Sequence, residues 1–88
     1  MAKNENLTEK DRKRFIQIGL KIAYYRGLTG LTQEQFAEKI NLSPGYLSHI
    51  ETSSYAQPFS LKTLFAIADL CNIAPYKLLM FDEDISEK

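Results

Sequence analysis

LTQEQFAEKINLSPGYLSHIET, residues 31–52, is the stretch that decides the fold. It predicts two short helices joined by a tight turn. Thr32 is a good N-cap for the first helix, and Gln35, three residues later, completes a capping box. Asn41 stands where the chain must bend, because asparagine tolerates the left-handed conformation better than most other residues. The stretch therefore predicts a helix, a turn and a helix within 22 residues.

The second of these helices separates into a buried and an exposed side. Ser43 is its expected N-cap, and Pro44 occupies the first helical position, where a missing N–H has no cost. Leu47 and Ile50 recur at helical spacing and are expected to face the core. The polar or small positions left on the outer side are Gly45, Tyr46, Ser48, His49 and Thr52.

Several small, apolar and polar positions in this stretch match the pattern of a known family. They are Gln33, Ala37, Ile40, Ser43, Leu47, Ser48, Ile50 and Glu51. The stretch resembles the helix-turn-helix of Cro/repressor-type (Xre-type) transcriptional regulators, and the resemblance extends over residues 18–79. It implies a compact, lambda-repressor-like domain that binds double-stranded DNA. It also implies a sequence-specific regulator, and we expect a repressor that binds a two-fold operator as a homodimer.

Helical periodicity precedes the motif as well. Thr8 is expected to cap a helix that begins near Glu9 and ends near Arg26 or Gly27. Gly19 lies inside this helix, where glycine costs about 1 kcal/mol relative to alanine. The resemblance to the family supports close packing of Gly19 against a neighbouring helix, which would compensate for this cost.

Two further helices are predicted after the motif, which makes the expected fold all-α with five helices. Ser60 is expected to cap LKTLFAIADLC, residues 61–71, with Leu61 on the buried side. Asn72 is a plausible left-handed residue at its end. Pro75 then begins a short fifth helix, PYKLLMF.

The 88 residues suit one small domain. We expect a flexible N-terminus over residues 1–8, the DNA-binding domain over 9–81 with its motif at about 33–52, and an acidic tail over 82–88. A single cysteine, no apolar run long enough for a membrane span and a polar N-terminus predict a cytoplasmic protein.

The net charge is zero, which by itself argues mildly against nucleic-acid binding. The charges are unevenly distributed, however. Residues 1–30 contain seven basic and three acidic side chains, whereas residues 82–88 contain one and four. The basic cluster near the start of the first helix is Lys10, Arg12, Lys13 and Arg14. Two interpretations of this cluster are open. It steers the protein toward DNA phosphates, or it is simply the solvated start of a helix.

The resemblance implies that the outer side of the second motif helix contacts bases. The matching positions are Pro44, Gly45, Tyr46, Ser48 and His49. Tyr46, Ser48 and His49 can form hydrogen bonds to base edges, whereas Pro44 is suited to a thymine methyl and Gly45 to close backbone approach. No arginine or asparagine is present for bidentate readout, so modest specificity per half-site is expected. The alternative is a polar helix face that only contacts solvent.

Phosphate contacts are expected at helix starts around the motif. The resemblance assigns one to Gln33, where the helix N-terminus also favours an anion. Ser60 and Lys62 begin the following helix and offer a second such end. The complete predicted set is Thr32, Gln33, Ser43, Thr52, Ser60 and Lys62. An ordinary surface role is the alternative for Gln33.

Arg26 and Glu51 match a structural ion pair of the family, which joins the first helix to the end of the second motif helix. The alternative is two independent surface charges.

The chain end carries more apolar surface than one short helix needs. Tyr76, Leu79, Met80 and Phe81 are therefore predicted to form a homodimer contact. The alternative is that they close the core of the same chain.

Enzymatic chemistry is not expected. His49 is the only histidine, no set of side chains has metal-ligand spacing, and no glycine-rich phosphate loop is present. Cys71 falls on an apolar stripe and is expected to be a core residue. We therefore expect no metal, no cofactor and no small-molecule ligand. The second functional hypothesis is a protein-interaction module, such as an antitoxin-like or adaptor subunit.

Overall fold

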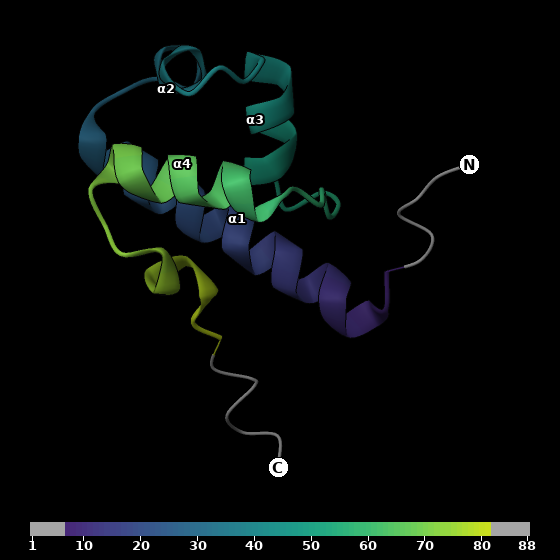
Figure 1. The fold of residues 1–88 in the computed structure, drawn as a ribbon. Coiled ribbons are helices and arrows are strands. Elements are labelled where there is room, and N and C mark those ends of the chain that lie inside the picture. Colours follow the sequence, from purple (N-terminus) through teal and green to yellow (C-terminus); the bar gives the residue numbers. More distant parts are fainter. Residues whose placement is uncertain (1–6, 82–88) are drawn as a thin grey trace.

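The computed structural model describes residues 7–81. The predictions for residues 1–6 and for the acidic tail lie outside this range. The described chain contains four α-helices and one 3₁₀ helix (Figure 1): α1 (Glu9–Thr29), α2 (Gln33–Lys39), α3 (Pro44–Glu51), α4 (Leu61–Cys71) and the 3₁₀ helix η2 (Pro75–Leu79). The fold is all-α, as predicted.

Every α-helix begins at a hydroxyl-bearing N-cap. The side-chain oxygens of Thr8, Thr32, Ser43 and Ser60 accept a backbone N–H three residues later, at 3.0, 3.1, 3.1 and 3.2 Å. Such caps satisfy donors that have no partner within the helix. The Gln35 side chain also accepts the Thr32 N–H at 2.9 Å, so the predicted capping box is present.

Residues with left-handed backbone conformation lie at the ends of α1, α2 and α4, and one helix end differs from the prediction. Asn41 and Asn72 adopt the left-handed conformation, with φ of 62° and 61°. α1, however, continues to Thr29, beyond the predicted end near Arg26 or Gly27. Gly30 takes φ 80° and donates its N–H to the Gly27 carbonyl at 3.1 Å. Gly30, and not Gly27, is the glycine that ends the helix.

The prediction of a fifth α-helix is corrected. Pro75–Leu79 is a 3₁₀ helix, in which the Lys77 N–H donates to the Ala74 carbonyl at 3.0 Å. Ala74 provides no side-chain cap. The 3₁₀ form is common in helical pieces as short as this one. This turn is sufficient to bury Leu78.

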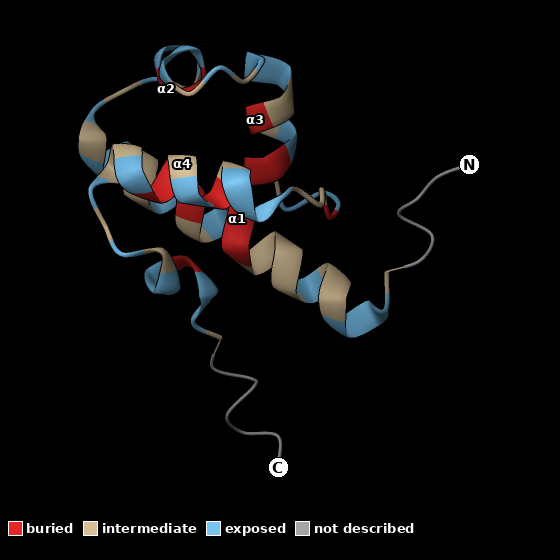
Figure 2. Cartoon of the chain, in the orientation of Figure 1, coloured by how far each residue is buried: buried red, intermediate tan, exposed pale blue. Residues whose placement is uncertain are grey.

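The core lies where the four α-helices and η2 meet (Figure 2). Its largest fully buried side chains are Phe36, Ile22, Leu47, Ile67 and Leu78, so every element contributes at least one. The expectation that Leu61 is buried is wrong, because its side chain is 62% exposed in the first turn of α4. Leu64, one turn later, takes that place in the core.

α1 and α3 are in backbone contact at Gly19. A Cβ atom at this position would overlap the carbonyl oxygen of Ile50 in the last turn of α3. The prediction of close helix packing at Gly19 is confirmed. It fixes how far α3 stands from α1.

Candidate nucleic-acid interface

α3 is held on its inner side and open on its outer side. Leu47 and Ile50 are buried, as predicted. Gly45 and His49 are exposed, and Ser48 is half-buried. A helix that is anchored in this way presents its outer side chains from a backbone that is already ordered. This side of α3 contains no lysine or arginine.

The last turn of α3 is tied to α1 by an ion pair between Arg26 and Glu51. Arg26 Nε donates to Glu51 Oε2 at 2.8 Å, and its terminal Nη2 donates to Oε1 at 3.0 Å. The remaining terminal nitrogen donates to the Leu31 carbonyl at 2.9 Å. The side chains of Arg26 and Glu51 are 19% and 4% exposed, and their hydrogen bonding raises the pKa of Arg26. Two-point pairing of this kind fixes orientation as well as distance.

Gln33 joins the same carboxylate from the start of α2. Its Nε2 donates to Glu51 Oε1 at 2.8 Å. Because a carboxylate only accepts hydrogen bonds, the amide nitrogen must face it, and one N–H of that nitrogen remains for another acceptor. Glu51 therefore connects α1, α2 and α3. Sequence analysis did not place Gln33 on Glu51, because the two residues are 18 positions apart.

Tyr46 differs from the other predicted base-contact residues. Its hydroxyl donates to the Pro58 carbonyl at 3.3 Å, and its ring packs against the core cluster. The side chain therefore connects α3 to the loop before α4. A base contact by Tyr46 would use the ring edge or require this hydrogen bond to be exchanged.

His49 has a neighbour that sequence analysis missed. The rings of His49 and Tyr55 meet edge to face, with centroids 5.3 Å apart and planes at 63°. Tyr55 lies in the loop after α3 and is partly exposed. It restricts the orientation of the His49 ring on the outer side of α3. No pattern in the sequence indicated this pair, because loop geometry brings the two rings together.

Residues 22–78 match the helix-turn-helix family. An uncharacterised HTH-type transcriptional regulator of Methanocaldococcus jannaschii is 34% identical over 64 residues, which cover 73% of this chain and 94% of the relative. The chain belongs to the helix-turn-helix family of Cro/repressor (Xre) type.

Solved structures agree with this assignment. SinR, a master regulator for biofilm formation solved in complex with DNA, is 30% identical with a TM-score of 0.65; the match covers 72% of this chain and 98% of that one. The restriction-modification controller protein C.AhdI from Aeromonas hydrophila has the same fold, with a TM-score of 0.67 at 24% identity; the match covers 75% of this chain and 93% of that one. This chain is thus a helix-turn-helix regulator of a DNA-binding family.

The remaining predicted phosphate contacts lie around the helix-turn-helix. The Thr32, Ser43 and Ser60 oxygens serve as caps, and their hydroxyl hydrogens are additional donors. The Thr52 hydroxyl donates to Ser54 Oγ at 3.1 Å and also accepts the Ser54 N–H. Lys62 is exposed and lines a hollow of about 280 Å³ beside the turn between α2 and α3. All of these contacts remain predictions.

The predicted dimer residues of this helix-turn-helix protein divide into two groups. Tyr76 and Met80 are 61% and 56% exposed, and Leu79 is also exposed. Phe81 is half-buried and packs against the chain's own core cluster. The first three are therefore available for a partner, whereas Phe81 contributes to the monomer.

Over residues 7–81, no three potential ligands gather into a metal site, and no helix there is long and apolar enough to cross a membrane. Cys71 packs partly against the core, and burial raises the pKa of its thiol. A raised pKa disfavours the reactive thiolate. The relatives are transcription regulators, which are not enzymes.

Proposed function

We propose that this protein is a sequence-specific transcriptional repressor that binds a two-fold operator as a homodimer, with α3 in the major groove. The observation that carries the proposal is the exposed outer side of α3 on a helix fixed by Leu47, Ile50 and the Arg26–Glu51 pair. The complex of the related SinR with DNA supports it. Ser48 and His49 are the principal base-reading side chains, with Pro44, Gly45 and Tyr46 beside them.

Selection of bound sites from random duplex DNA tests this function. We expect a roughly palindromic site whose half-sites lie about one helical turn, or 34 Å, apart. Replacing His49 by alanine should weaken binding to that site by about 1–3 kcal/mol per half-site, because one base contact is lost in each. Tyr24→Ala is a matched control, since Tyr24 is exposed on the outer side of α1. No enriched site, or equal binding by His49→Ala and the wild type, would contradict the proposal.

The dimer contact has its own test. Met80→Glu places a charge on the exposed end of the chain and is expected to convert a dimer into a monomer in analytical ultracentrifugation at tens of micromolar. Leu61→Glu is the control, because Leu61 is 62% exposed in the first turn of α4 and outside the proposed contact. Met80 is preferable to Phe81 for this test, since a charge at Phe81 would also disturb the core. A wild-type monomer at this concentration would exclude the contact.

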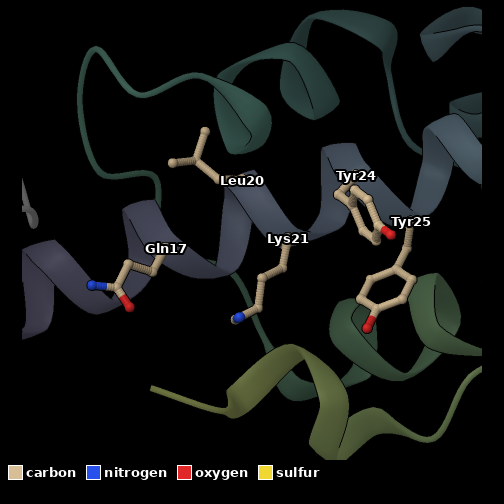
Figure 3. Close-up of a pocket in the computed structure, with 5 residues that line it drawn as sticks. All are labelled: Gln17, Leu20, Lys21, Tyr24 and Tyr25. Atoms are coloured by element: carbon tan, nitrogen blue, oxygen red, sulfur yellow. The ribbon is translucent and has the colours of Figure 1, made fainter. Parts of the chain in front are cut away.

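A second function, as a protein-interaction module, is favoured by the outer side of α1. Leu20, Tyr24 and Leu28 are exposed at successive helical turns. A shallow hollow of about 410 Å³ lies among Gln17, Leu20, Lys21, Tyr24 and Tyr25. Figure 3 shows that all five come from α1, so no second element encloses a small ligand there. A SinR/SinI protein complex, whose matched chain is 27% identical with a TM-score of 0.67, gives further support. Failure to enrich any DNA site would favour this function.

A further inference from the structure

The first part of α1 is more basic than the rest of the described chain. Residues 9–21 contain five basic and two acidic side chains. Residues 22–81, which include the whole family match, contain four of each. The helix-turn-helix unit itself therefore has no net positive charge. Affinity for DNA depends strongly on cations that displace counterions from phosphates, so a neutral unit needs them from elsewhere.

Few basic side chains within residues 22–81 are placed to contact DNA phosphates. Arg26 is engaged with Glu51 and the Leu31 carbonyl. Lys39 ends α2, at the opposite end from Gln33, and Lys77 lies in η2. Lys62 alone among these four stands at a predicted phosphate contact. Over the described residues, the start of α1 is where basic side chains concentrate.

The fold directs this basic segment past the end of α3. Gly19 touches the Ile50 carbonyl, which places that point of α1 against the last turn of α3. Arg12 precedes Gly19 by seven residues, so it lies on the same side of the helix and about 10 Å farther along. In Figure 1 the first turns of α1 extend beyond the other helices, on the side where the loop between α3 and α4 lies.

An aromatic contact holds the segment beside a predicted phosphate site. The rings of Phe15 and Phe59 meet edge to face, with centroids 5.6 Å apart. Phe59 directly precedes Ser60, the N-cap of α4, and Lys62 follows two residues later. The basic turns of α1 are thereby tied to the start of α4. Asp11 and Lys13 lie about 100° to either side of Arg12 on α1. Lys13 is exposed, whereas Asp11 pairs with Arg14 at 3.5 Å.

We propose that the first turns of α1 are a second DNA-contact site, in which Arg12 and Lys13 bind backbone phosphates that flank the sequence read by α3. The inference rests on the proposed DNA-binding function and adds a site outside the family match at residues 22–78. Such contacts supply affinity and register without reading sequence. The site extends the DNA footprint beyond each half-site.

The test is a salt titration of DNA binding by the full chain, followed by fluorescence anisotropy. The variant is Arg12→Gln with Lys13→Gln, which retains good helix formers at a half-buried and an exposed position of α1. Removing two phosphate contacts from each protomer, and so four from the bound dimer, should reduce the slope of log affinity against log salt by about 3.6. At 100 mM salt we expect binding weaker by a factor on the order of a thousand, and by the same factor on selected and random duplexes. Circular dichroism confirms that the variant is folded.

A control variant and a shortened DNA duplex complete the experiment. Lys39→Gln with Lys77→Gln removes the same charge and should keep the wild-type slope and affinity. A duplex trimmed to the selected site should weaken wild-type binding and leave the Arg12/Lys13 variant unaffected.

The outcomes separate this inference from the proposed function. Wild-type slope and affinity in the Arg12/Lys13 variant, or an equal effect of the control, would overturn the second site while α3 binding stands. Absence of any selected site for the wild type would overturn both.

Discussion

Replacing Glu51 by alanine is expected to lower the free energy of unfolding by about 3 kcal/mol, because it leaves the Arg26 charge in a largely buried position without its partner. Gln33 loses an acceptor in the same change. In a domain of this size, such a loss corresponds to a fall in Tm of roughly 12–24 °C. Thermal denaturation followed by circular dichroism measures it.

Two comparisons identify the cause of this loss. Arg26→Met combined with Glu51→Met removes both charges and should recover most of the stability, since a buried pair contributes little net relative to apolar side chains. Asp11→Asn breaks the partly exposed pair with Arg14 and should cost about 0.5 kcal/mol or less, since the Asp11 side chain is 47% exposed and that of Arg14 is 34% exposed. A Glu51→Ala protein as stable as the wild type would contradict the role assigned to the carboxylate.

Gly19→Ala is expected to destabilise the protein by about 1–3 kcal/mol, although alanine is the better helix former. The added methyl group would overlap the Ile50 carbonyl oxygen, and both atoms belong to packed helices. α3 must then move away from α1. Chemical denaturation with urea gives the change in free energy.

Gly27→Ala is the matched control in the same helix. No atom lies within 4 Å of the position that its Cβ would occupy, and the residue is exposed. Here alanine should stabilise the protein by about 0.5–1 kcal/mol. Opposite signs for the two substitutions would establish that the backbone contact, and not helix propensity, requires glycine at position 19. The same sign at both positions would argue against the contact.

Helix starts and turns could be predicted because their chemistry is local. Thr32 and Gln35 form their capping box across three residues. Asn41 and Asn72 adopt positive φ for reasons that lie within the residue itself. The end of α1 was harder to predict, since Gly27 and Gly30 are both possible ends, and only Gly30 adopts the left-handed conformation.

The candidate site was less predictable, because its contacts join distant parts of the chain. The hydrogen bonds from Tyr46 to Pro58, from Gln33 to Glu51 and from Arg26 to Glu51 span 12, 18 and 25 residues. Of these, the last was expected only because two positions match the family. Spacing alone does not indicate any of them.

The amino-acid sequence by itself determined the all-α class, the N-caps, the left-handed asparagines and which side of α3 faces the core. Each depends on side chains within about one helical turn of one another. Tertiary structure alone decided that Tyr46 turns its hydroxyl to Pro58, that Glu51 holds Gln33, and that the basic start of α1 passes the end of α3. The reason is physical: these arrangements exist only once the helices pack against one another, and the close approach at Gly19 sets the relative positions of α1 and α3.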